Sequence, residues 1–218
     1  MRCPLLACLL SLPVLSLAQS PTPATHFYVG AGASVLTDIG FRDSSYPYSR
    51  TYSPTLVGPA LTLGWQFTPA LALEVGGAYA WRTTQDTYTY GSYSGVGLVT
   101  ANLHVHQRVF TLPVLVRYTL TPIAGSLYLD VLGGATMQRA TLSYNSSIDE
   151  NNGNILYTGG KSSLTTAFLT LGPAVRYSLS PRLSLTVDPT LNMALNNSHR
   201  EFQDRLLWNL RAGVRYSL

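Results

Sequence analysis

Stretches of about a dozen residues alternate between apolar and small or polar side chains. From Leu183 to Leu195 every odd position is apolar, whereas the even positions carry Ser, Thr, Asp, Asn and Ala. A helix would scatter these two sets around its surface, but a β-strand places them on opposite faces. The segment therefore predicts a strand with one apolar face.

The same alternation predicts seven more strands. The eight predicted strands are 27–36, 55–67, 71–82, 108–120, 126–138, 167–179, 183–195 and 206–218. No stretch after Gln19 reaches the roughly 18 to 20 apolar residues of a membrane helix. The fold class is therefore all-β.

A short internal repeat indicates how the strands are connected. LVRYTL, AVRYSL and GVRYSL end at Leu120, Leu179 and Leu218, and GWQF at 64–67 is a looser copy. The first two repeats and GWQF each run into a turn with proline, and each interval between these prolines holds an outgoing strand, a loop and a returning strand. This order predicts four antiparallel hairpins.

The connections differ between the two ends of these hairpins. The proline turns are short, whereas long polar loops are expected at 37–54, 83–107 and 141–163, with a shorter one at 196–204. Short turns at one end and long loops at the other are typical of an outer-membrane barrel, with periplasmic turns and extracellular loops. Alternation of Thr and Tyr over 87–90 suggests that the strands of the second hairpin continue beyond the bilayer.

The composition of the two faces favours lipid over water as the surroundings of the apolar face. Only 11% of the residues are charged, and the other face carries mostly Gly, Ala, Ser and Thr, unlike a soluble exterior. Eight strands can close into a barrel with no free edge and a lumen narrow enough for side chains to fill. Aromatic residues bound the apolar face and predict two girdles at the membrane interfaces. They are Trp65, Phe67, Tyr118, Tyr177 and Tyr216 at the turn end, and Tyr79, Trp81, Phe110 and Trp208 toward the loops.

The N-terminus has the layout of a secretory signal peptide. A positive start at Arg2 precedes an apolar run over 4–17, and Ser16-Leu17-Ala18 forms a small-x-small site before Gln19. We expect cleavage between Ala18 and Gln19, a short lead over 19–25 and a barrel domain over 26–218. A lipoprotein signal ending at Cys8 is the alternative, but too few residues separate it from Arg2.

Several of these motifs resemble the small bacterial outer-membrane β-barrel family. They are the strand FTLPVLVRY at 110–118, which is PorT-like in its LPVLVRY portion, the pairs Gly58-Pro59 and Gly172-Pro173, and the terminal VRYSL. The resemblance covers the whole mature chain. It implies an eight-stranded antiparallel up-and-down transmembrane barrel with short periplasmic turns and long extracellular loops, located in the bacterial outer membrane.

The resemblance also implies partners. These are outer-membrane lipid and the barrel-assembly machinery, which reads a terminal signal in such proteins. This chain ends on Leu218 rather than on an aromatic residue, so we expect Tyr216 to carry that signal.

Seven charged residues share the lumen side of the predicted strands. They are Glu74, Asp130 and Asp188 in outgoing strands, and Arg117, Arg176, Arg211 and Arg215 in returning strands. One interpretation is an ion-pair network that fills a narrow barrel, and the other is a charged constriction that selects ions. The network is favoured because unpaired buried charges are costly.

Other candidate sites carry weaker signals. His104 and His106 share one face of a strand but lack a third metal ligand nearby, and the run 149–154 lacks the spacing of a calcium loop. Ser198, His199 and Asp204 lie in one polar loop, as the catalytic groups of a rim hydrolase could. Both cysteines lie in the first eight residues, and without Arg2 the 13 basic and 10 acidic residues are scattered. We therefore expect no cofactor, no metal, no catalytic residues and no nucleic-acid partner.

The polar loops are rich in tyrosine, which suits contact with an extracellular ligand or envelope partner. The residues are Tyr46, Tyr48, Tyr52, Tyr88, Tyr90, Tyr93, Tyr144 and Tyr157. The predicted function is non-enzymatic: surface recognition, adhesion or envelope integrity. A narrow pore or small-molecule conduit is the alternative, and a rim hydrolase is a third possibility.

Overall fold

A computed structural model describes residues 26–37, 55–91, 98–121, 125–150, 154–196 and 205–218. The predicted signal peptide, its cleavage site and the lead over 19–25 lie outside these residues. The described residues form eight strands, and none of them forms a helix long and apolar enough to cross a membrane. The strands are β1 (His26–Thr37), β2 (Thr55–Gln66), β3 (Leu71–Gly91), β4 (Leu98–Thr119), β5 (Leu127–Glu150), β6 (Asn154–Ser178), β7 (Leu183–Ala194) and β8 (Leu206–Ser217).

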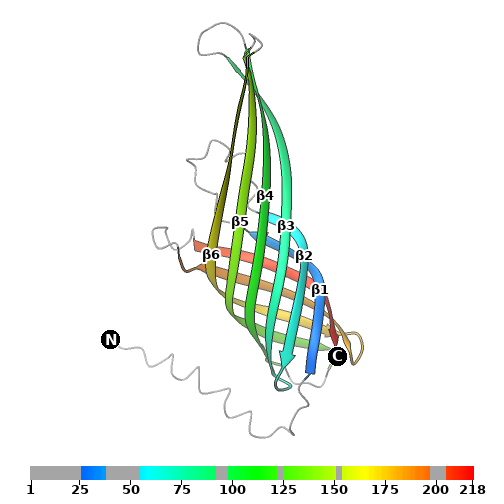
Figure 1. Cartoon of the computed structure of the whole chain (residues 1–218). Helices are drawn as coiled ribbons and strands as arrows, with labels where there is room; N and C mark the ends of the chain where they lie inside the picture. The colour runs from blue at the N-terminus through cyan, green and yellow to red at the C-terminus, as the bar shows by residue number, and fades with distance from the viewer. Residues whose placement is uncertain (1–25, 38–54, 92–97, 122–124, 151–153, 197–204) are drawn as a thin grey trace, which may run out of the picture.

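The eight strands form one closed antiparallel barrel in chain order (Figure 1). Each strand pairs with the next, and β1 closes on β8 from Tyr28 opposite Ser217 to Val35 opposite Leu210. Closure pairs the backbone of every strand on both sides within the barrel, as a strand protein in lipid requires. The predicted fold class is confirmed.

The proline turns at one end of the barrel are tight. Residues 67–70 connect β2 to β3, and 179–182 connect β6 to β7. In both turns a hydroxyl accepts a hydrogen bond from the first amide of the next strand, Thr68 Oγ1 from Leu71 N at 3.0 Å and Ser180 Oγ from Leu183 N at 3.1 Å. The third predicted proline turn includes residues 122–124, which lie outside the described residues.

The two faces of each strand follow the predicted alternation. In β7 the even positions are buried or half-buried, whereas Leu185 and Val187 are 42% and 44% exposed on the outer surface. Asp188, between them and the loop end, is 2% exposed and points into the lumen. The apolar face is therefore the outside of the barrel.

Two of the expected loops are largely strand. The ranges 83–107 and 141–163 were expected as loops, but β3 to β6 extend through most of them and reach 21 to 25 residues, against 12 for each of the other four. Backbone pairing continues without a break from Ala78 opposite Thr111 to Gly91 opposite Leu98. The prediction was wrong here because it relied on alternating apolar residues, whereas the outward side chains of these extensions are mostly polar.

These extensions form a four-stranded sheet that rises beyond the barrel in Figure 1. We call residues 79–91, 98–110, 139–150 and 154–167 the projecting sheet. Among the described residues, β3 has no β2 partner beyond Ala78, and β6 has no β7 partner before Phe168. The projecting sheet is therefore supported by the barrel only at its base.

Candidate functional site in the barrel lumen

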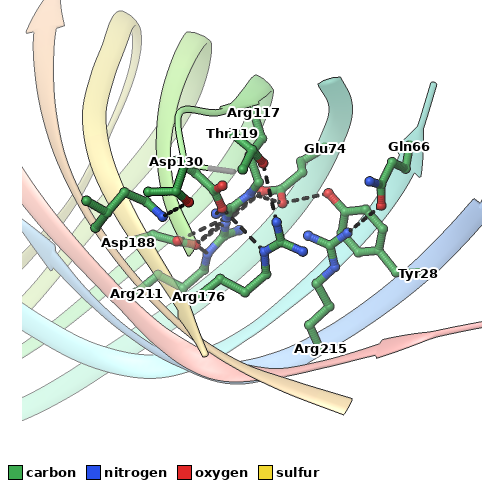
Figure 2. Close-up of polar contacts among 12 residues, drawn as sticks. Tyr28, Gln66, Glu74, Arg117, Thr119, Asp130, Arg176, Asp188, Arg211 and Arg215 are labelled. Carbon is green, nitrogen blue, oxygen red and sulfur yellow. Dashed lines mark hydrogen bonds and ion pairs between the residues drawn. The ribbon is translucent and has the colours of Figure 1, made fainter. Parts of the chain in front are cut away.

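The lumen near the turn end holds all seven of the predicted charged residues (Figure 2). They come from six strands, β3 to β8, at positions where the side chain points inward. Six of them form one connected set of ion pairs, and Arg215 lies beside this set. We call these seven residues together with Tyr28 the lumen cluster.

Arg117 lies at the centre of the lumen cluster. Its Nε donates to Glu74 Oε1 at 2.7 Å, its Nη1 to Asp130 Oδ2 at 2.9 Å, and its Nη2 to both carboxylate oxygens of Asp188 at 3.0 Å. The Arg117 side chain is 3% exposed. One guanidinium thus connects acids from three strands, β3, β5 and β7.

Arg211 forms a second bridge between two of the same acids. Its Nη2 lies 2.6 Å from Asp188 Oδ2 and 2.9 Å from Glu74 Oε2, and its Nη1 donates to Thr62 Oγ1 at 2.7 Å. Glu74 and Asp188 therefore each contact two arginines. Each of these acids thus connects its own strand to β4 and β8. Removing either acid would leave buried positive charge uncompensated.

Arg176 completes the ion-pair set at its edge. Its Nε lies 3.5 Å from Asp130 Oδ2, and its Nη2 donates to Thr119 Oγ1 at 3.3 Å. The second carboxylate oxygen of Asp130 is buried and has no hydrogen-bond partner among the described residues. The pairing on this side of the cluster is looser than around Arg117.

Arg215 does not pair with an acid among the described residues. Its guanidinium carbon lies 3.2 Å from the centre of the Tyr28 ring, and its Nη2 donates to Gln66 Oε1 at 3.4 Å. The Tyr28 hydroxyl donates to Glu74 Oε1 at 2.7 Å. Tyr28 thus joins Arg215 to the acids through its ring and its hydroxyl.

Tyr28 is the member of the cluster that sequence analysis did not single out. It lies on the lumen side of β1, between the outward-facing Phe27 and Val29, and it is 2% exposed. Its ring lies against Gly64 of β2, where a Cβ atom would overlap the ring carbons. An aromatic residue on the lumen face opposite a glycine was the signal that could have identified it.

Two uncharged layers fill the lumen on the loop side of the cluster. Thr170 Oγ1 lies 2.7 Å from Thr136 Oγ1 and donates to Asn192 Oδ1 at 2.7 Å. Farther along, an apolar cluster lies where the projecting sheet begins. It contains Leu36, Leu56, Ala60, Ala78, Ala80, Leu103, Val105, Val109, Ala140 and Leu142.

Three small spaces border the lumen cluster among the described residues. One of about 50 Å³ lies on the loop side of Asp188 and Arg211, one of about 20 Å³ lies among Tyr28, Glu74 and Arg117, and one of about 10 Å³ lies toward the turns. Spaces of this size hold from about one water to a few waters. The cluster therefore has the geometry of a structural plug rather than of an open constriction.

The nine aromatic residues proposed as girdles all lie at outward positions. Eight of them are at least 36% exposed, and Tyr118 is half-buried. Phe27 adds to the group at the turn end, because its ring stacks on Trp65 with centroids 5.8 Å apart. At the loop end, Tyr79 stacks on Trp81 at 5.6 Å.

The weaker candidates do not assemble into a site within the described residues. His106 Nδ1 lies 3.0 Å from Thr83 Oγ1, and no group of three His, Cys, Asp or Glu able to hold a metal occurs there. Ser198, His199 and Asp204 lie outside the described residues. So does part of the run 149–154, and its other side chains are not described.

Comparison with known proteins places this architecture in a family. The outer membrane protein β-barrel domain model matches residues 5–217. A major outer membrane protein from Thermus thermophilus is 17% identical, with a TM-score of 0.54 over 90% of this chain and 100% of that chain. OprG from Pseudomonas aeruginosa is 10% identical, with a TM-score of 0.50 over 89% and 96%. Ail, the attachment invasion locus protein of Yersinia pestis, is 10% identical, with a TM-score of 0.48 over 89% and 97%.

At these identities the solved structures show a shared fold and nothing more. No curated protein matches the chain by sequence. The family match covers nearly the whole chain and agrees with the closed eight-stranded barrel, the outward apolar face and the filled lumen. The chain belongs to the outer membrane protein β-barrel domain family, located in the bacterial outer membrane.

Proposed function

We propose that this protein is a non-enzymatic surface-recognition protein whose barrel holds the projecting sheet beyond the membrane. The observation that carries the proposal is the length of β3 to β6, which continue 9 to 13 residues beyond the apolar segments that predicted them. A protein that served only to occupy the membrane would need strands of about 9 to 11 residues. The additional strand length presents surface outside the bilayer.

The projecting sheet offers two kinds of contact to a partner. Its two outer strands have backbone groups that no described strand pairs, and exposed strand edges can accept a further strand. Tyr88 and Tyr157 are 39% and 77% exposed on it. Tyrosine gives a large amphipathic contact area at low entropic cost.

The filled lumen argues against the alternative of a pore. Arg117 and its three acids span the lumen from β3 to β7, and the neighbouring spaces have volumes of only about 50 and 20 Å³. Ions would need a connected column of water through this cluster. Conduction is therefore not the function that the geometry supports best.

Trimming the projecting sheet tests the proposal. Replacing residues 86–103 and 146–158 each by Asn-Gly would join paired positions, Gln85 with His104 and Asn145 with Gly159. Cells that produce the full chain or the trimmed chain would be compared for binding to glycan arrays and protein-coated surfaces. Their sensitivity to detergent would be measured in parallel.

We expect the trimmed barrel to fold, as judged by heat-modifiable migration on gels, and to lose binding that the full chain confers. Equal binding by the two chains, together with detergent sensitivity in cells with the trimmed chain, would contradict recognition and favour a role in envelope integrity.

Two narrower points are part of the same proposal. They are removal of a signal peptide after Ala18 and a PorT-like relationship carried by residues 112–118.

A further inference from the structure

The basic residues of the described strands are distributed unevenly between the two faces. Four arginines of the described strands point into the lumen, and Arg82 occupies an inward position of β3. Three basic residues of the described strands face outward, and all three are exposed. They are Arg108 on β4, Arg139 on β5 and Lys161 on β6. Within the described strands, the outward basic residues thus lie on one side of the molecule, over β4 to β6.

These three residues begin where the apolar surface of the barrel ends. Along β4 the outward residues Leu112 and Val114 are exposed and apolar, followed by Phe110 of the girdle and then by Arg108. Arg108 pairs with Trp81, and Arg139 pairs with Phe110. Aromatic girdles mark the level of the lipid headgroups. Arg108 and Arg139 therefore lie at the headgroup level of the outer leaflet.

No acid whose side chain the structure describes neutralises the positive charge on this face. None of the three basic residues forms an ion pair within the described part of the chain. Among the side chains that the structure describes on the projecting sheet, Asp86 is the acid. It occupies an inward position of β3, on the opposite face from the three basic residues, and accepts a hydrogen bond from the Tyr88 hydroxyl at 3.3 Å. The contrast with the lumen, where each acid contacts an arginine, indicates that an external anion balances this face.

A hollow lies farther from the membrane on the same sheet. Its volume is about 450 Å³, and His104, Asn145 and Tyr157 are among the residues that line it. This volume falls within the range of about 300 to 1,000 Å³ found for ligand pockets. An imidazole, an amide and a phenol can donate to and accept from sugar hydroxyls, and the exposed ring offers an apolar face to a sugar ring.

From this order we infer that the outward face of β4 to β6 binds a phosphorylated glycolipid of the outer leaflet. Arg108, Arg139 and Lys161 would bind the phosphate groups at the girdle, and the hollow at His104 and Tyr157 would bind sugars that extend outward. The inference goes beyond the proposed recognition function. Its phosphate-binding part does not depend on that function, because Arg108, Arg139 and Lys161 lie outside the segments that trimming removes, whereas Tyr157 of the hollow lies within one. Charge and position both match a headgroup anchored in the adjacent leaflet.

The test uses the full folded chain in detergent micelles. The probes are bisphosphorylated lipid A, the same lipid without its phosphates, and inorganic phosphate, with binding measured by native mass spectrometry and by titration. The variant carries Arg108→Gln, Arg139→Gln and Lys161→Gln together. The matched control is Arg182→Gln, which removes an exposed charge from the turn at the other end of the barrel.

We expect wild type and the Arg182 control to bind lipid A alike, with binding that weakens as salt increases. The triple variant should bind roughly fivefold more weakly for each charge removed. Heat-modifiable migration would show that each chain is folded, and single substitutions would replace the triple variant if it does not fold. Equal binding of lipid A by the folded variants and wild type would overturn the inference. So would equal affinity for the lipid without phosphates, or competition by inorganic phosphate at the same concentration as lipid A.

Discussion

Asp188 is a lumen acid whose loss should lower the stability of the barrel. It accepts from Arg117 and Arg211 while 2% exposed, so Asp188→Asn leaves two guanidiniums without this charge. Removing one partner of a buried pair costs about 3 to 5 kcal/mol. We expect the urea midpoint in vesicles and the temperature of the gel transition to decrease accordingly. Asp86→Asn, outside the lumen, should change stability by less than about 0.5 kcal/mol, and equal effects of the two changes would contradict the network.

Gly64 is small because the Tyr28 ring occupies the space of its side chain. Gly64→Ala should displace the ring from Arg215 and Glu74, at a cost of about 1 to 3 kcal/mol for overpacking. The same substitution in a Tyr28→Ala background should cost much less, which a double-mutant cycle in urea would measure. Gly77→Ala is the matched control, since nothing lies within 4 Å of its added Cβ. Additive effects at Gly64 and Tyr28 would show that the ring does not constrain this site.

Sequence alone identified the charged residues of the lumen but not their partners. Alternation determines which side of a strand a residue occupies, so Glu74 and Arg117 could be assigned to the lumen. Their contacts depend on strand register and on long-range closure, which no local pattern contains. Arg215 illustrates the difference, because its expected acidic partner is replaced by the Tyr28 ring.

At the scale of the strands, apolar alternation was sufficient for number, order and facing. It was insufficient for length, because β3 to β6 continue with polar outer residues. In the extension of β4, Leu103 and Val105 alternate with His104 and His106. Leu103 and Val105 are buried on the inner face. In water the outer face needs no apolar residues, so the signal that marks a strand in lipid disappears at the interface while the strand continues.

The facing of β7 gives a prediction for lipid contact. Leu185→Arg and Val187→Arg place a charge on the outer surface and should each cost about 2 to 4 kcal/mol near the midplane. Thr186→Arg lies between them, half-buried on the lumen side opposite Arg176, so its cost should reflect crowding and like charge rather than lipid. Equilibrium unfolding in bilayers of two thicknesses separates these causes. Only the outward substitutions should depend on thickness, and an equal dependence at all three positions would contradict the facing.

For the whole molecule, the predicted signal peptide gives a prediction for the first residue of the mature chain. Cleavage after Ala18 removes the N-terminal apolar run and leaves Gln19 as the first residue. Intact mass spectrometry of protein from the outer-membrane fraction should give the mass of residues 19–218, allowing for cyclisation of the terminal glutamine. A lipid-modified N-terminus at Cys8, or recovery from the soluble periplasm, would contradict this prediction.

Single-channel recording in planar bilayers tests whether the lumen of the barrel is closed by its side chains or conducts ions. Insertion would first be verified by heat-modifiable migration of protein recovered from the same vesicles used for fusion. With insertion verified, we expect no stable conductance steps from wild type, because Arg117 and its three acids occupy the lumen. Discrete, long-lived steps whose ion selectivity changes in Asp188→Asn would show instead that the lumen conducts.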